Sequence, residues 1–186
     1  MAMTSTRFLS SALLLAAMLA LTSPRPVLAA SRQELERDAK NALQSLTRKN
    51  TAARLLGQKA KAVLVFPSMV KAGFLFGGQI GEGVLFKNGR PAGYYNSVAA
   101  SYGLQAGVQT FGYALFFMND GALAYLNSSN GWEVGVGPSI VVVDEGMGKS
   151  MTSTTLTQDV YAFIFDQRGL MAGIGIQGSK ITKIEK

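Results

Sequence analysis

The spacing of apolar residues changes near residue 61. Before that point they recur every three or four positions, as on one side of a helix, and Ser31 with Glu34 matches the capping box that begins many helices. We expect a second helix to begin at Asn50 or Thr51 and to end near Lys59. After residue 61 the apolar period becomes two and turn signals recur. The sequence therefore predicts a helical segment, 31–60, and a mainly β segment, 62–186.

The β segment is expected to contain many short strands joined by turns. Pro67 is expected to end the first strand, and Asp166-Gln167-Arg168-Gly169 to form a turn. Ala122 to Leu126 is the exception, because alanine and leucine after Asp120 favour a short helix. The strands are predicted near 62–66, 73–80, 83–87, 92–96, 98–109, 111–118, 132–136, 139–143, 160–165, 170–177 and 181–184.

Glycine recurs at even spacing along one predicted strand. Because strand side chains alternate in direction, one face carries Gly73, Leu75, Gly77, Gln79, Gly81 and Gly83, and the other carries Phe74, Phe76, Ile80 and Val84. Glycine weakens a strand, so its repetition indicates tight bending or close approach of another backbone or a ligand. We predict an α+β fold, with N-terminal helices packed on a curved, glycine-rich antiparallel β-sheet that is barrel-like.

The N-terminus has the features of a secretory signal peptide. Arg7 precedes a short apolar run, 8–21, and Val27 and Ala29 are small residues at cleavage-site positions. The run is too short to span a bilayer comfortably. We expect cleavage after Ala29, which leaves one domain, 30–186, in the periplasm or outside the cell. The sequence has no cysteine, so neither a disulfide nor a lipid-modified N-terminal cysteine is expected.

Positive charge is concentrated in one stretch of the sequence. Residues 30–186 hold 16 basic and 11 acidic residues, yet 39–81 hold seven Lys or Arg and no acid. A local basic stretch favours an anionic partner, because surface charge attracts and holds opposite charge. The other interpretation is a solvated face of an amphipathic helix. The predicted residues for binding a lipid headgroup are Arg48, Lys49, Arg54, Lys59, Lys61 and Lys71.

The composition removes the commonest catalytic groups. Without His and Cys the chain cannot form Ser-His-Asp, Cys-His or the usual zinc sites, and no metal or cofactor is expected. Ser68 and Lys71 fit the S-x-x-K pattern of acyl-serine enzymes, with Ser128-Ser129-Asn130 as a second motif. The third motif is missing, because Lys149 is followed by Ser150-Met151 where glycine is required. We therefore predict no enzymatic activity. Nucleic acid is not expected, because aromatic residues in strands are more often core than stacking platforms.

Several glycine-rich motifs occur together: Phe66-Pro67-Ser68, Lys71-Ala72-Gly73-Phe74, Gly131-Trp132, Gly135-Val136-Gly137-Pro138 and Gly169-Leu170-Met171-Ala172-Gly173. From about Leu35 to the C-terminus the sequence resembles the SYLF domain, also called the Ysc84 actin-binding or DUF500 domain. Eukaryotic proteins of that family bind phosphoinositide-bearing membranes, and some bind actin. The resemblance implies a non-enzymatic, exported lipid-binding protein of the cell envelope, whose partner is an anionic phospholipid or membrane surface. Actin is not expected as a partner of an exported protein. The alternative is an envelope structural or protein-binding module that recognises an acidic partner.

Overall fold

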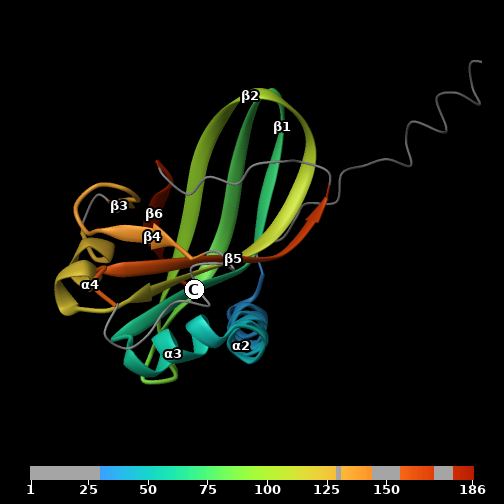
Figure 1. Cartoon of the computed structure of the whole chain (residues 1–186). Coiled ribbons are helices and arrows are strands. Elements are labelled where there is room, and N and C mark those ends of the chain that lie inside the picture. The colour runs from blue at the N-terminus through green and yellow to red at the C-terminus, as the bar shows by residue number, and fades with distance from the viewer. Residues whose placement is uncertain (1–29, 129–130, 144–155, 170–177) are drawn as a thin grey trace, which may run out of the picture. The chain divides into compact units, whose positions relative to one another are not determined.

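The computed structural model describes residues 30–128, 131–143, 156–169 and 178–186, with backbone only at 74–75 and 101–106 (Figure 1). Residues Ser31–Lys186 form one compact unit. The elements are α2 (Arg32–Lys49), α3 (Thr51–Lys59), β1 (Ala62–Lys87), β2 (Arg90–Phe117), α4 (Asp120–Leu126), β3 (Trp132–Glu133), β4 (Ile140–Val142), β5 (Val160–Gly169) and β6 (Lys180–Ile184). The predicted signal peptide, the predicted strand 170–177, and Ser129, Asn130, Lys149 and Ser150 lie outside the described residues.

Both predicted N-terminal helices are confirmed, and each begins with a side-chain cap. The Ser31 hydroxyl accepts a hydrogen bond from the Glu34 amide at 3.3 Å, and the Glu34 carboxylate accepts one from the Ser31 amide at 3.0 Å. Asn50 ends α2 and caps α3, because its side-chain oxygen accepts a hydrogen bond from the Ala53 amide at 3.0 Å. These caps satisfy amides that the first helical turn leaves without partners.

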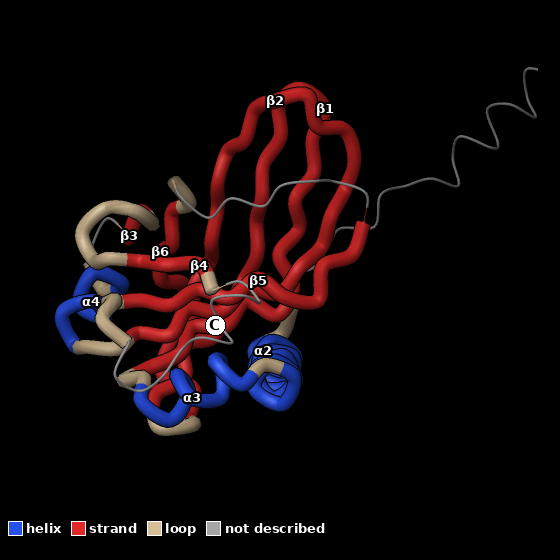
Figure 2. Tube along the Cα trace, in the orientation of Figure 1, coloured by secondary structure: helices blue, strands red, loops and turns tan. Residues whose placement is uncertain are grey.

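Strands β1 and β2 form one long antiparallel ribbon (Figure 2). Its turn is Asn88-Gly89, whose φ angles of 51° and 73° suit a tight hairpin. The expected break at Pro67 is wrong, because β1 continues through it. Pro67 lies in a register shift between Phe66 and Met69, where a bulge needs no ladder hydrogen bond from the missing proline N–H.

A second expected turn also proves to be part of a strand. Asp166 to Gly169 continues β5, and Asp166 has a φ of 49°. This residue faces a register shift between Thr110 and Gly112 of β2. The chain is therefore kinked by a bulge at this point and does not reverse.

The glycine face lets β1 fold back on itself. A Cβ placed on Gly73 would lie 2.5 Å from the Gly77 Cα, and one on Gly83 would lie 2.8 Å from the Val65 carbonyl oxygen. Neither position has room for a side chain. The predicted close approach of another backbone is confirmed, and that backbone belongs to the same strand.

The other strands extend the sheet from the free edge of β2. β5 pairs with the C-terminal part of β2 and β6 with its N-terminal part, while β4 and β3 add to β5 and β6. The described strands form a curled half-barrel with β3 and β4 at the two ends of the order, which confirms the curved sheet (Figure 2). The β4–β5 pair is parallel, unlike the all-antiparallel prediction. The long connection between these strands permits the crossover that parallel pairing requires.

The curled sheet buries side chains on both faces. We call the face that carries Phe66 and Tyr113 the inner face; their rings stack 5.6 Å apart in a core completed by α4 and Trp132. The opposite face, which carries Tyr94 and Phe116, is the outer face and is partly covered by α2 and α3. The α4 helix confirms the prediction of a short helix after Asp120. None of the helices in the described ranges is long and apolar enough to span a bilayer.

Candidate anion-binding surface

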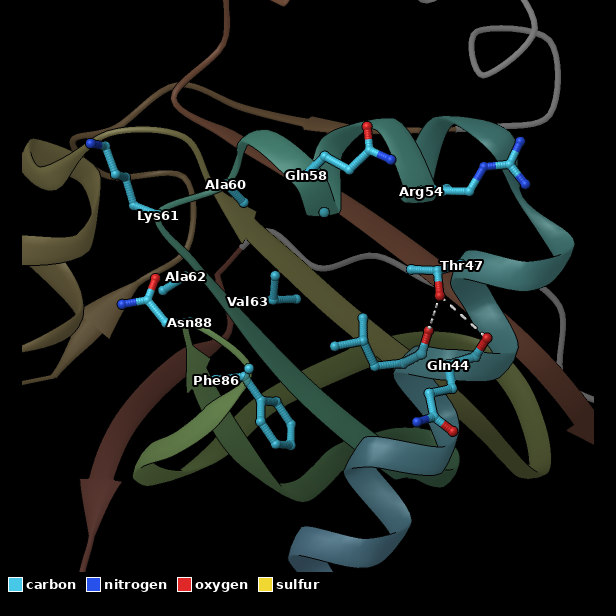
Figure 3. Close-up of a pocket in the computed structure, with 13 residues that line it drawn as sticks. Gln44, Thr47, Arg54, Gln58, Ala60, Lys61, Ala62, Val63, Phe86 and Asn88 are labelled. Carbon is cyan, nitrogen blue, oxygen red and sulfur yellow. Dashed lines mark hydrogen bonds between the residues drawn. The ribbon is translucent and has the colours of Figure 1, made fainter.

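A pocket of about 560 Å³ lies where α2, α3, the start of β1 and the β1–β2 turn meet (Figure 3). Its lining residues are Leu43, Gln44, Thr47, Arg54, Gly57, Gln58, Ala60, Lys61, Ala62, Val63, Phe86, Asn88 and Gly89. Val63 and Phe86 are buried and apolar, whereas the two cations and the three carboxamides are exposed. Among the described residues the lining contains no acidic side chain, so the pocket combines an apolar base with a rim suited to an anion.

Helix α3 supplies the positive side of this pocket. Arg54 and Gln58 are four residues apart and share one side of α3, and Lys61 follows the C-cap Ala60. Figure 3 shows Gln58 between Arg54 and Lys61 along the chain. All three residues line the pocket. Within the part of the chain that the structure describes, these three side chains form no hydrogen bond or ion pair that would occupy them.

Thr47 closes the α2 side of the pocket without offering a free donor. Its hydroxyl is within hydrogen-bond distance of two carbonyl oxygens of its own helix, that of Leu43 at 2.9 Å and that of Gln44 at 3.3 Å (Figure 3). Such a bond to the preceding turn satisfies the hydroxyl within the helix. The side chains that can donate to a bound anion are therefore those of the cations Arg54 and Lys61 and the carboxamides of Gln44, Gln58 and Asn88.

Five of the six predicted headgroup-binding residues are exposed on or beside α2 and α3. These are Arg48, Lys49, Arg54, Lys59 and Lys61, which we call the helical basic surface. Arg54 and Lys61 line the pocket, and the other three lie outside it. Lys49 forms an exposed ion pair with Asp166 at 3.3 Å. Sequence reasoning missed Phe86 and Asn88, because only the folding of the distant β1–β2 turn brings them to the helices.

Lys71 lies apart from these five residues. It is 5% exposed on the inner face, where it is the cross-strand partner of Gln109, itself 5% exposed. It therefore cannot share an exposed surface with the helical cations. The S-x-x-K pattern also fails as a site here, because Ser68 is exposed while Lys71 is buried, and residues three apart in a strand point to opposite faces.

The acidic residues of α2 are confined to its N-terminal half. There Glu36 accepts a short hydrogen bond from the Tyr94 hydroxyl and pairs with Arg32 at 3.0 Å. The bond from Tyr94 and then the bond from Arg32 hold the pKa of the Glu36 carboxyl below its usual value. The contacts attach α2 to the outer face and place this negative charge away from the pocket lining. Arg48 and Lys49 follow in the last turn, where cations also complement the helix dipole.

Residues 98–186 match the model of the Ysc84 family, described as a Las17-binding protein actin regulator. This part of the chain is similar to Ysc84 domains. The match includes the motifs at Gly131-Trp132 and Gly135 to Pro138, so the resemblance to SYLF domains is confirmed there. No curated protein gives a significant match to the chain.

The pocket is built from residues that precede the matched Ysc84 region. Every lining residue comes before residue 98, and the motifs around Phe66 and Lys71 do so as well. The matched region nevertheless packs against α3. A Cβ placed on Gly57 of α3 would lie 3.7 Å from the ring of Phe116, which is an ordinary van der Waals contact. The family match thus covers part of the sheet and none of the described residues that line the pocket.

Proposed function

We propose that this protein is a non-enzymatic lipid-binding protein that binds anionic phospholipid headgroups through the helical basic surface. The observation that carries the proposal is a pocket whose lining, in the part of the chain that the structure describes, contains Arg54 and Lys61 and no acidic side chain. The carboxamides of Gln44, Gln58 and Asn88 can donate hydrogen bonds to phosphate or glycerol oxygens. Arg48 and Lys59 add exposed positive charge elsewhere on the same two helices.

The expected affinity follows from the number of cations that engage. Each Lys or Arg near an anionic membrane contributes about 1 kcal/mol, so the two pocket cations together correspond to roughly 30-fold in affinity. Lys49 remains available as well, because an exposed ion pair such as the one with Asp166 is worth at most about 1 kcal/mol and exchanges readily.

We place the protein in the periplasm or outside the cell, after cleavage behind Ala29, where phosphatidylglycerol and cardiolipin are the anionic lipids to test. The intact mass of the exported protein checks this cleavage site, since it should equal that of residues 30–186. The alternative function is an envelope protein-binding module in which the same surface meets an acidic partner. The description of the Ysc84 family as a Las17-binding protein names a protein partner, and it favours that alternative.

Cosedimentation with vesicles tests the proposal. The double variant Arg54→Glu, Lys61→Glu should bind phosphatidylglycerol vesicles at least roughly 30-fold more weakly than the native protein. The matched control Arg37→Glu, Lys183→Glu makes the same change in net charge at exposed positions outside the surface, and it should lose much less. Thermal unfolding confirms that both variants are folded.

Two outcomes would contradict the proposal. Equal losses in both double variants would show that net charge alone determines binding. A native protein that does not sediment with these vesicles would favour the protein-binding alternative.

A further inference from the structure

The β1–β2 ribbon bends over at the end of the domain opposite α2 and α3 (Figure 1). We call residues 70–80 of β1 and 98–108 of β2 the arch. Its outer face exposes the side chains of Val70, Phe76, Ile80, Val98 and Val108 by 39, 80, 57, 44 and 59%. These are five of the eight exposed large apolar residues among the described residues, so exposed apolar surface is concentrated on the arch.

The register makes this apolar surface continuous. Ile80 lies directly opposite Val98, and exposed Ala72 lies opposite Val108. Gly78 and Ala100, also exposed, form the next pair towards the bend. The two arch ranges contain a single charged residue, Lys71, and it is buried on the inner face. Ordinary solvated strands carry polar side chains on the face turned to water, and the arch carries apolar ones.

Cations flank the arch on both arms of the ribbon. On one arm Val70, Thr110 and Arg168 lie in one cross-strand row. On the other arm Ile80, Val98 and Lys180 form the equivalent row. Cross-strand partners share a face of the sheet, and both Arg168 and Lys180 are exposed. Neither cation forms an ion pair within the described ranges.

Three acidic residues lie near these rows. Glu133 of β3 is the exposed cross-strand partner of Lys180, and no ion pair joins the two among the described residues. Glu82 is the next residue after Ile80 on the same face of β1, and it pairs with Lys186 at 2.8 Å. Asp166, on the Arg168 side, pairs with Lys49 at 3.3 Å. The arch therefore presents an apolar surface flanked by exposed cations, of which Arg168 has no acidic residue in its cross-strand row. This arrangement is typical of segments that lie in the interface of an anionic membrane, where cations meet phosphates and apolar side chains meet acyl chains.

We propose that the arch is a membrane-inserting surface of this protein. Phe76, the most exposed apolar side chain and close to the bend, enters the interface of an anionic bilayer, and Arg168 and Lys180 contact lipid phosphates. The flanking charge commits the occupant to an anionic lipid surface, because a second copy of the arch would bring the same Arg168 to the contact and no acidic residue of the arch itself. The inference goes beyond headgroup binding at the helices, since it assigns a different surface and a different physical interaction.

The arch and the helical basic surface lie at opposite ends of the domain (Figure 1). A flat bilayer that touches the arch leaves α2 and α3 on the far side of the domain. The arch can therefore insert whether or not the helical surface binds lipid, and the two ideas can be tested separately.

Fluorescence quenching by brominated phospholipids tests insertion directly. Ile80→Trp places a reporter on the arch, and Val136→Trp is a matched control, because Val136 lies outside the arch and is also 57% exposed. Trp132 is 2% exposed and provides the same background in both proteins. With vesicles of phosphatidylglycerol and brominated phosphatidylcholine, we expect Ile80→Trp to show a blue shift and a loss of emission, and Val136→Trp to show neither.

A loss-of-function variant supplies an independent readout. Phe76→Ser, Ile80→Ser should retain the native melting temperature within a few degrees, because both side chains are exposed, and should bind these vesicles more weakly. Quenching of Ile80→Trp that persists when Arg54→Glu and Lys61→Glu are added would support the arch even if headgroup binding at the helices fails.

Two results would overturn the inference. Unquenched Ile80→Trp in protein that sediments with the vesicles would assign binding to the helical surface alone. A native dimer that Phe76→Ser, Ile80→Ser converts to a monomer, together with unquenched Ile80→Trp, would make the arch a contact between copies of the chain.

Discussion

At the scale of single residues, Gly73 has no room for a side chain. A Cβ there would lie 2.5 Å from the Gly77 Cα and 2.7 Å from the Phe76 carbonyl oxygen, and neither backbone atom can move alone. We expect Gly73→Val to lower the free energy of unfolding by roughly 1 to 3 kcal/mol or more. The control Gly57→Ala meets only ordinary contacts and should gain roughly 0.5 to 1 kcal/mol from helix propensity. Denaturant unfolding measures both, and an unchanged Gly73→Val would refute the close crossing of β1.

Tyr113 presents the opposite case, in which removal of a group should be harmless. Its hydroxyl is buried on the inner face and has no hydrogen-bond partner within the described structure, and burial raises its pKa. Tyr113→Phe keeps the ring stacked on Phe66 and removes an oxygen that is desolvated without compensation. We expect a melting temperature equal to or above that of the native protein. A clear decrease would indicate a partner for this hydroxyl.

At the scale of elements, local signals were sufficient for the helices and insufficient for the strands. The caps at Ser31 and Asn50 act within three residues, so the sequence could predict both helices closely. The ends of a strand depend on what pairs with it. Pro67 and Asp166 are turn-forming residues by type, yet each lies in a bulge because a long partner strand continues past it.

Asp159 joins three elements and makes their stability depend on pH. Its carboxylate accepts hydrogen bonds from the Ser139 hydroxyl and amide, both at 2.8 Å, and from Asn119, the cap of α4, at 2.7 Å. The Ser139 bonds and then the Asn119 bond lower its pKa below the ordinary 3.8. Stabilisation by the ionised form is therefore complete above about pH 3.8 and is lost as the pH falls through the lowered pKa.

The variant Asp159→Asn tests this linkage. Its melting temperature should be below the native value near neutral pH, and the difference should shrink once the pH falls below 3.8. Melting curves over that range supply the measurement. A difference that does not change with pH would show that the charge of Asp159 is not involved.

At the scale of the whole molecule, the sequence predicted the components of the candidate site but not their assembly. The acid-free stretch contains Arg54 and Lys61, whereas the pocket exists because the β1–β2 turn brings Phe86 to them. Lys71 was grouped with the other cations by its place in the acid-free stretch, and only the curl of the sheet buries it. Exposure of the arch depends on the same curl. Contacts between residues far apart in sequence leave no local pattern.

The central claim is that the protein recognises anionic lipid by charge, and cosedimentation at two salt concentrations tests it most directly. At about 0.1 M salt the protein should bind phosphatidylglycerol vesicles more than phosphatidylcholine vesicles. At about 1 M salt the screening length falls from about 10 Å to about 3 Å, so the excess should disappear, and any binding that remains should be equal for both lipids. Equal binding to the two lipids at low salt, or no binding to either, would contradict the claim.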